Sequence, residues 1–248
     1  MRSATVRPDG TKIRWVELPG REPARVYLHG YGSSASHYYA EAVLHPALAG
    51  HRSLLLDLLG HGISDRPTDA TYALEEHADH VAAALRATAV AGAGVVAHSM
   101  GGAVAILLAV RHPELVSRLV LVDGNLDPCP ELAARLGTEA EFVHGGGLAR
   151  ELVRAGEHWA ATMRLTGPEA LYRSGVHLAA GSLPSVRELL ARLPIPRTYL
   201  HPSTTAPADP EGLTAAGVRL VAIPDSGHNI MLDNRDAFAE ATAAALAG

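Results

Sequence analysis

The sequence predicts an α/β fold in which helices flank a mostly parallel β-sheet. Short runs of aliphatic and β-branched residues alternate with longer segments of helical character along most of the chain. This alternation is typical of right-handed strand–helix–strand crossovers, which build a parallel sheet. An Ala-, Arg- and Glu-rich stretch at residues 126–193 interrupts the alternation and predicts a helical insertion. A chain of 248 residues with 48% hydrophobic content suffices for one core with such an insertion.

The first 125 residues predict a hairpin followed by alternating strands and helices. Strand-like runs at 5–7 and 12–18 flank the turn sequence Pro8-Asp9-Gly10 and predict an antiparallel pair. Beyond the hairpin, short apolar runs predict strands, and apolar residues at helical spacing predict helices. The predicted strands lie at residues 25–28, 53–58, 95–98 and 119–122, and the helices at about 33–49, 72–89 and 100–111.

The remainder of the chain predicts the insertion and the end of the sheet. Glycine and proline at 145–147, 167–168 and 181–184 divide the insertion into short helical pieces. Strand patterns then return at 197–200 and 218–223, and a last helix is predicted at about 234–246. We therefore predict a core made of residues 1–125 and 194–248, with residues 126–193 forming a helical lid.

Charge and cysteine content argue against several classes of partner and site. A net charge of −5 gives no basic surface for nucleic acid and no polybasic patch for a membrane. Cys129 is the single cysteine, so no disulfide can form within the chain. The first residues lack the apolar segment of a signal peptide, and no run is long enough to span a bilayer, so a cytoplasmic location is expected. No cluster has metal-ligand spacing, and neither a metal nor another cofactor is expected.

Ser99 lies at a sharp corner between a predicted strand and a predicted helix. The apolar run that ends at His98 is followed at once by Ser99, and a buried helix begins directly after it. Such a corner strains the serine backbone and leaves room only for small residues two positions away. Ala97 and Gly101 occupy those positions. The corner would present the Ser99 hydroxyl at a helix N-terminus, where a backbone N–H can meet an oxyanion.

Three further loops follow predicted strands and should lie near Ser99, because the carboxyl ends of parallel strands share one edge of a sheet. Glycines at 30 and 32 let the first loop turn toward the serine, so the N–H of Tyr31 can join that of Met100 in an oxyanion hole. The second loop begins at Asp123. The third, at residues 224–229, presents His228.

These motifs resemble those of the α/β-hydrolase fold family, and the resemblance covers nearly the whole chain. They occur in the order that the family uses: His29-Gly30-Tyr31-Gly32, Asp57 with Gly60-His61-Gly62, His98-Ser99-Met100-Gly101-Gly102, and Ser226-Gly227-His228. The resemblance implies that Ser99 is a nucleophile, that His228 is its base, and that the amides of Tyr31 and Met100 bind the oxyanion. In such a fold His29, His61 and Asp57 are expected to brace loops.

The acidic partner of His228 departs from the family's usual pattern. Most members carry it after the penultimate strand, where this chain has Thr204 and Thr205, and Asp209 follows several residues later. A minority place it after the strand that follows the nucleophile helix, and Asp123 occupies that position. A carboxylate there could hold the His228 tautomer. Asp123 is favoured, with Asp209 and Asp127 as alternatives.

The predicted function is hydrolysis of a small or medium carboxylic ester through an acyl-enzyme on Ser99. The small-molecule substrate would enter between core and lid, where Trp159, Met163 and Tyr172 are candidate pocket residues, although ordinary lid packing explains them equally well. An alternative is a carbon–carbon bond hydrolase or lyase with the same machinery. A different class is a ligand-binding receptor with little turnover, which would have no need of His228. The oligomeric state is not predicted.

Overall fold

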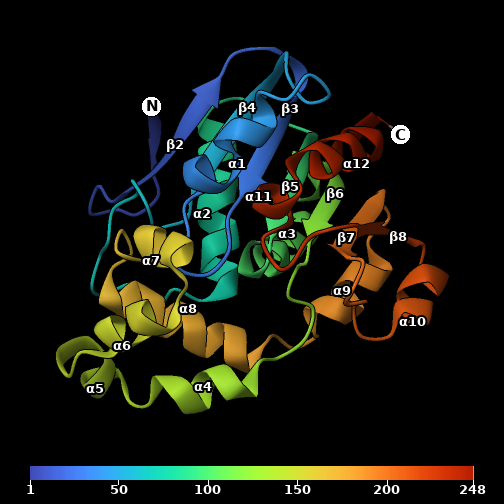
Figure 1. Ribbon diagram of the computed structural model, residues 1–248. Helices are drawn as coiled ribbons and strands as arrows, with labels where there is room; N and C mark the ends of the chain where they lie inside the picture. The colour runs from blue at the N-terminus through green and yellow to red at the C-terminus, as the bar shows by residue number, and fades with distance from the viewer. Residues whose placement is uncertain (248) are drawn as a thin grey trace.

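The computed structural model describes residues 1–247, and its centre is one mixed sheet (Figure 1). The strands run in the spatial order β1 (Arg2–Thr5), β2 (Lys12–Leu18), β4 (His51–Asp57), β3 (Arg21–Leu28), β5 (Ala93–His98), β6 (Val116–Val122), β7 (Arg197–Pro202) and β8 (Val218–Ile223). β2 is antiparallel to both β1 and β4, and all other neighbours are parallel. The predicted hairpin and mostly parallel sheet are therefore confirmed, but the first strand covers residues 2–5 rather than the predicted 5–7.

Helices cover both faces of the sheet and bury its central strands. α1 (Ala35–Val43), α11 (Ile230–Asp233) and α12 (Arg235–Ala247) pack on one face, and α2 (Leu74–Ala87) and α3 (Met100–Arg111) pack on the other. Every residue of β5 is buried, which explains its continuous apolar sequence. Ser99 therefore directly follows a fully buried strand.

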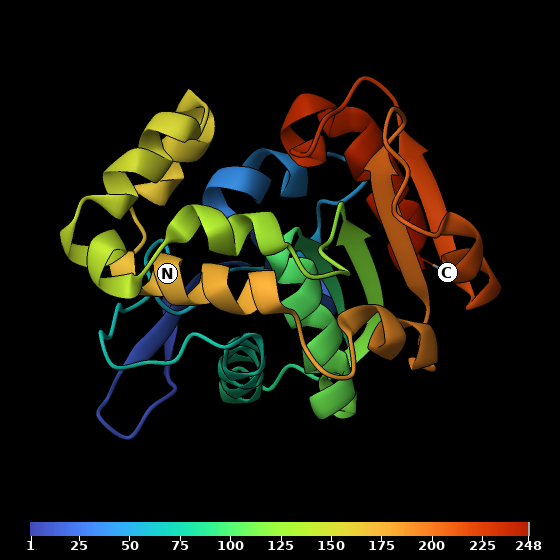
Figure 2. The same cartoon turned by 90° about the horizontal axis from the view of Figure 1, so that it is seen from below.

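Six helices lie between β6 and β7, where the sequence predicts a helical insertion. They are α4 (Pro130–Leu136), α5 (Glu139–His144), α6 (Gly147–Arg154), α7 (Glu157–Met163), α8 (Pro168–Ala180) and α9 (Val186–Arg192). α4 and α5 pack on α8, whereas α9 packs on α3 beside the sheet (Figure 2). α4 and α7 supply residues to the cavity at Ser99, so part of this insertion lies over the carboxyl ends of the strands.

Some element boundaries differ from those predicted. α1 ends at Val43 rather than near residue 49, because Pro46 cannot donate the backbone hydrogen bond that a continuing helix needs. The short helices α10 (Pro210–Ala215) and α11 were not predicted. Four to six residues span too few turns to show helical periodicity.

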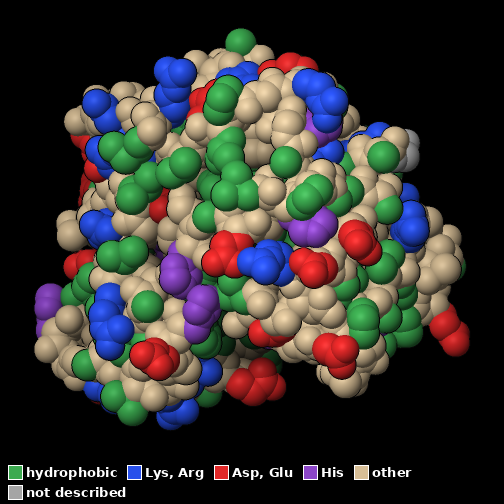
Figure 3. Space-filling model, turned by 45° about the horizontal axis from the view of Figure 1, so that its top comes forward, with side chains coloured by type: hydrophobic (Ala, Val, Ile, Leu, Met, Phe, Trp, Pro, Cys, Tyr) green, Lys and Arg blue, Asp and Glu red, His purple; other side chains and the backbone are tan. Residues whose placement is uncertain are grey.

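The surface carries intermingled charges. On the face in Figure 3, acidic and basic side chains lie next to one another. Exposed ion pairs join Arg86 to Glu114 at 2.6 Å and Arg111 to Asp79 at 2.7 Å. Within residues 1–247, no helix combines the length and the apolar character needed to cross a bilayer.

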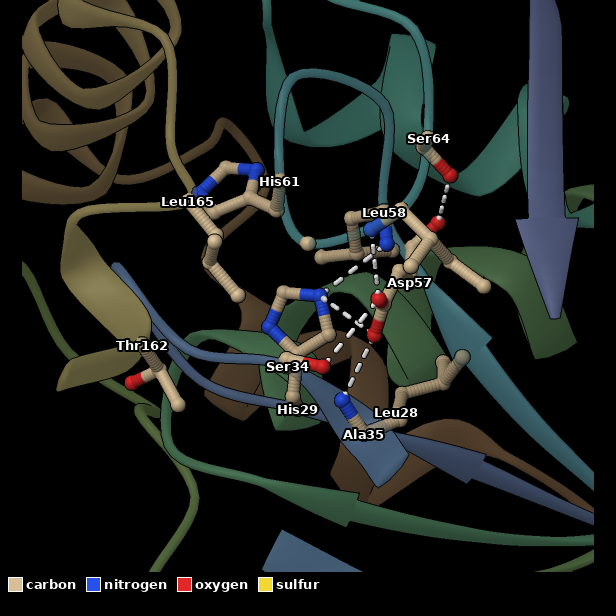
Figure 4. A network of polar contacts seen from close by, with 12 residues as sticks. Leu28, His29, Ser34, Ala35, Asp57, Leu58, His61, Ser64, Thr162 and Leu165 are labelled. Atoms are coloured by element: carbon tan, nitrogen blue, oxygen red, sulfur yellow. Dashed lines mark hydrogen bonds and ion pairs between the residues drawn. The ribbon is translucent and has the colours of Figure 1, made fainter. Parts of the chain in front are cut away.

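Asp57, at the end of β4, holds two loops beside the site (Figure 4). Its carboxylate is 1% exposed and accepts hydrogen bonds from the Ala35 N–H at 2.6 Å and the Ser34 hydroxyl at 3.1 Å. The Ile63 N–H donates to the same carboxylate at 2.9 Å. Burial raises the pKa of Asp57, and these donors oppose that rise. The expectation that Asp57 braces a loop is confirmed.

Two buried histidines connect the same loops in their neutral form. His29 accepts a hydrogen bond from the Leu58 N–H at Nε2 (3.0 Å), so its Nδ1 carries the proton that it donates to the Gly30 carbonyl at 2.7 Å. His61 places Nδ1 3.0 Å from the Leu59 carbonyl. Burial lowers the pKa of His29 to about 4 and that of His61 to about 3. Both histidines therefore brace loops, as expected.

These lowered pKa values predict a loss of stability in mild acid. An unfolded histidine takes up its proton near pH 6.5, whereas His29 and His61 in the folded chain resist protonation until far lower pH. Their stabilisation is complete above pH 6.5 and declines as pH falls, by up to about 1.4 kcal/mol per pH unit for each group. Urea unfolding at pH 7.5, 6.5 and 5.5 should show this decline. The prediction is limited to pH 5.5 and above. At lower pH the raised pKa of Asp57 increases the stability of the folded chain as pH falls, which opposes the effect of the histidines.

A matched pair of variants tests whether the buried histidines cause the loss of stability as pH falls. His61→Asn removes a buried titrating group and should make the decline shallower, even where the variant is less stable at pH 7.5. His144→Asn changes an exposed histidine and should leave the pH dependence unchanged. Equal stability of the unmodified protein at all three pH values would contradict the prediction.

Candidate active site

The corner between β5 and α3 places Ser99 in a strained conformation. Its φ of 52° and ψ of −123° lie where non-glycine residues are rare. A Cβ on Gly101 would lie 2.5 Å from the His29 carbonyl oxygen, and one on Gly30 would lie 2.9 Å from the Ser99 Cβ. The corner thus requires glycine at both positions. Ser99 itself is 8% exposed, and its N–H donates to the Val122 carbonyl at 3.1 Å.

His228 and Asp123 meet from different ends of the sequence. His228 lies in the loop between β8 and α11, and its Nδ1 is 2.7 Å from Oδ2 of Asp123, which directly follows β6. The Asp123 N–H donates to the Leu200 carbonyl at 2.8 Å, which fixes the carboxylate relative to β7. The Nδ1 proton of His228 is therefore committed to Asp123, and Nε2 is left to accept a proton.

Asp209 and Asp127, the two alternative acids, form other interactions. Asp209 caps α10 by accepting a hydrogen bond from the Gly212 N–H at 3.0 Å. Asp127 forms a two-pronged ion pair with Arg187 at 2.6 and 2.8 Å. Asp123 is the carboxylate that the structure brings within hydrogen-bonding distance of His228.

His98 lies between His228 and the aromatic wall of the site. Its Nε2 donates to the His228 carbonyl at 2.9 Å, and the two rings have centroids 4.5 Å apart. Tyr38 stacks on the other side at 5.9 Å. Burial holds the pKa of His98 well below its usual range. His98 thus supports the loop that carries His228 as a neutral ring.

Asn125 is a site residue that sequence reasoning missed. The Ser99 hydroxyl donates to Asn125 Oδ1 at 3.1 Å, and Asn125 Nδ2 donates to the Cys129 sulfur at 3.4 Å. Among the described residues, no hydrogen bond joins Ser99 to His228. An asparagine in a loop after a strand ordinarily indicates a turn. Its place two residues after Asp123, at the carboxyl end of β6, is the signal that could have identified it.

Met100 directly follows Ser99 in the chain, and Tyr31 lines the same cavity as Ser99. Met100 is the first residue of α3, so its N–H has no intrahelical acceptor. Within residues 1–247, the Tyr31 N–H has no backbone acceptor either. Gly32 takes a left-handed φ of 64°, which lets the loop turn back beside Ser99.

A cavity of about 330 Å³ opens in front of Ser99. Trp159 lines it, but Met163 and Tyr172 do not, so those two predicted pocket residues are wrong. Met163 is fully buried against Gly32, and the Tyr172 hydroxyl donates to the Gly137 carbonyl at 3.0 Å. The lining residues are Gly30, Tyr31, Ser33, Tyr38, His98, Ser99, Asn125, Cys129, Glu131, Leu132, Arg135, Trp159, Leu178, His228 and Asn229.

The side chains gathered here favour proton transfer and anion stabilisation. In the described part of the chain, no three His, Cys, Asp or Glu side chains are grouped so that they could hold a metal ion. The site instead contains a hydroxyl, an imidazole whose Nε2 makes no hydrogen bond within residues 1–247, and a carboxylate behind that imidazole. It also contains the Met100 N–H at the N-terminus of α3 and the Tyr31 N–H in the loop after β3. This set can activate a hydroxyl and bind a developing oxyanion.

Known proteins share segments of this sequence. The 2-hydroxymuconate semialdehyde hydrolase of Pseudomonas sp. (strain CF600) is 40% identical over 96 residues, which are 38% of this chain and 34% of that protein. An esterase of Mycobacterium tuberculosis is 35% identical over 136 residues, which are 54% of this chain and 43% of that protein. These matches therefore span less than half the length of each relative.

The whole fold has counterparts among solved structures. An esterase from Exiguobacterium antarcticum superposes with a TM-score of 0.80 and 19% identity, covering 99% of each chain. The family described as alpha/beta hydrolase fold matches residues 24–147, half of the chain, including Ser99 and the loops of Tyr31 and Asp123. With the observed sheet and helices, these matches establish that the chain belongs to the α/β hydrolase fold family.

Proposed function

We propose that this hydrolase cleaves a small or medium carboxylic ester through an acyl-enzyme on Ser99. The observation that carries the proposal is the 2.7 Å contact between His228 Nδ1 and Asp123 beside the same cavity as Ser99. A carboxylate at Nδ1 fixes the tautomer in which Nε2 is the base. Of the three candidate acids, Asp123 is therefore assigned the orienting role.

In the proposed reaction the Ser99 hydroxyl leaves Asn125 and transfers its proton to His228 Nε2. Its oxygen attacks the acyl carbon, and the N–H groups of Tyr31 and Met100 bind the oxyanion. Collapse of this intermediate releases the alcohol, which takes the proton from His228. A water then loses a proton to the same nitrogen and attacks the acyl-enzyme. Collapse releases the carboxylic acid, and the Ser99 oxygen takes the proton back from His228.

The cavity supports a small-molecule substrate. Its volume of about 330 Å³ lies at the lower end of ordinary ligand sites. Leu132, Leu178 and Trp159 give it apolar walls, and Glu131 and Arg135 are its charged side chains other than histidine. These features favour an uncharged acyl group of short to medium length.

A second candidate is hydrolysis of a carbon–carbon bond. Its support is the 40% identity to 2-hydroxymuconate semialdehyde hydrolase, over the segment that includes 38% of this chain. A serine, a histidine base and an oxyanion hole serve both reactions, so the two candidates differ in substrate rather than in machinery.

Labelling with a fluorescent fluorophosphonate tests whether Ser99 is an activated nucleophile. The folded protein should be labelled, and Ser99→Ala should not be labelled because the attacking oxygen is absent. His228→Ala should slow labelling by orders of magnitude, since the hydroxyl loses its base. Circular dichroism establishes that each variant is folded. Folded protein without labelling would favour the ligand-binding receptor.

Paired substitutions test the orienting acid. Asp123→Asn should lower kcat on p-nitrophenyl butyrate by about 10³- to 10⁴-fold, because the amide favours the wrong His228 tautomer. Asp209→Asn and Asp127→Asn are the matched controls, and each should retain kcat within about threefold. Their thermal stabilities should be measured alongside, since both carboxylates hold local structure. A near-normal Asp123→Asn with an inactive Asp209→Asn would overturn the assignment.

A substrate panel separates the two candidate reactions. With p-nitrophenyl esters, kcat/KM should be highest at a short or medium acyl chain, because the cavity limits acyl length. In parallel, 2-hydroxymuconate semialdehyde is incubated with the protein and its loss is measured by liquid chromatography. Rapid loss of that compound, with only weak ester turnover, would favour the carbon–carbon hydrolase.

A further inference from the structure

Helix α7 of the insertion contacts the loop that carries the Tyr31 amide. The indole N–H of Trp159 donates to the Tyr31 carbonyl at 2.8 Å, and the Thr162 hydroxyl lies 3.2 Å from the Gly32 carbonyl. Met163 packs against Gly32, its Cε 3.2 Å from where a Cβ would lie. Figure 4 shows Thr162 beside the segment that carries His29 and Ser34. Three side chains of one short helix therefore contact two consecutive residues of this loop.

Hydrogen bonds outside the insertion also hold this loop. His29 Nδ1 donates to the Gly30 carbonyl at 2.7 Å, and the Ser33 N–H donates to it at 3.2 Å. That carbonyl shares its peptide plane with the Tyr31 N–H. The next two carbonyls, of Tyr31 and Gly32, are those held by α7. Three successive peptides are thus fixed, with the proposed oxyanion donor in the first.

We infer that α7 positions the oxyanion hole: Trp159 and Thr162 act through the carbonyls of Tyr31 and Gly32 to aim the Tyr31 N–H at the reacting carbonyl. This inference rests on the proposed function, because it assumes an oxyanion beside Ser99. Gly32, at a left-handed φ of 64°, gives the loop a flexible point directly after Tyr31. Without contacts from α7, rotation at that point would redirect the Tyr31 amide.

The geometry gives the insertion a second role besides covering the cavity. Trp159 both lines the cavity and holds the Tyr31 carbonyl. A displacement of α7 that opened the cavity would therefore also release the loop.

Substitution of Thr162 tests the positioning of the loop without changing a contact to substrate, because Thr162 is buried and absent from the cavity wall. Its hydroxyl proton is shared between the Gly32 carbonyl and the Trp159 carbonyl at 3.1 Å. Thr162→Val keeps the side-chain shape and removes that donor. Thr162→Ser keeps the donor. Thr166→Val is the matched control, since the buried Thr166 hydroxyl has no hydrogen-bond partner within residues 1–247.

The experiment measures kcat and KM on p-nitrophenyl butyrate, and the inhibition constant of a trifluoromethyl ketone that forms an oxyanion on Ser99. Thr162→Val should lower kcat about tenfold with KM within twofold, a part of the 10²- to 10³-fold cost of losing an oxyanion donor. The ketone should bind about tenfold more weakly. Thr162→Ser should restore both values, and Thr166→Val should match the unmodified protein.

Trp159→Phe gives an independent second measurement. Phenylalanine retains an aromatic ring against Tyr31, whose ring centroid lies 6.4 Å from that of Trp159, but removes the N–H donor. Its kcat should also fall about tenfold, with a parallel loss of ketone affinity. Unchanged kcat and ketone affinity in both Thr162→Val and Trp159→Phe would overturn the inference while leaving the proposed function intact. Failure of the unmodified protein to hydrolyse the ester or bind the ketone would overturn both.

Discussion

The close approach of backbone segments around Ser99 is the constraint on which the rest of the site depends. A Cβ on Gly101 would lie 2.5 Å from the His29 carbonyl, and one on Gly102 would lie 2.9 Å from the Gly124 Cα. The start of α3 is thereby pressed against the loops that follow β3 and β6. Because β5 is buried along its whole length, the corner cannot retreat to relieve this contact. The strained φ of Ser99 follows from this crowding.

The neutral imidazole of His29 links the end of β4 to the loop that carries Tyr31. His29 accepts from the Leu58 N–H and donates to the Gly30 carbonyl, which shares a peptide with the Tyr31 N–H. A protonated His29 would direct a second N–H at the Leu58 N–H, so only the neutral ring satisfies both contacts. Complete burial supplies that protonation state. The loop is thus aligned by a group whose charge must remain zero.

Sequence reasoning identified the site residues at strand ends, but it did not identify those whose role depends on contacts of the insertion. Ser99 and Asp123 directly follow strand patterns, and His228 lies in the loop after another. A parallel sheet brings such positions to one edge. Asn125 also lies after a strand, but an asparagine there ordinarily indicates a turn. Thr162 carries no comparable pattern, because its contacts depend on how the insertion is placed in space. Met163 failed as a pocket residue for the same reason. An apolar side chain on a short helix shows that it is buried, but not which side it faces.

The loop after β6 forms hydrogen bonds to both Ser99 and His228, the proposed nucleophile and base. Asp123 accepts a hydrogen bond from His228 Nδ1, and two residues later Asn125 accepts a hydrogen bond from the Ser99 hydroxyl. The Asn125 N–H also donates to the Ser99 carbonyl at 3.0 Å, which joins this loop to the corner. The serine hydroxyl therefore donates to a neutral amide in this structure, and the proposed reaction requires it to leave Asn125 for His228. An acid placed after β7 would have left these two tasks to separate loops, whereas here one rigid segment sets the geometry of both.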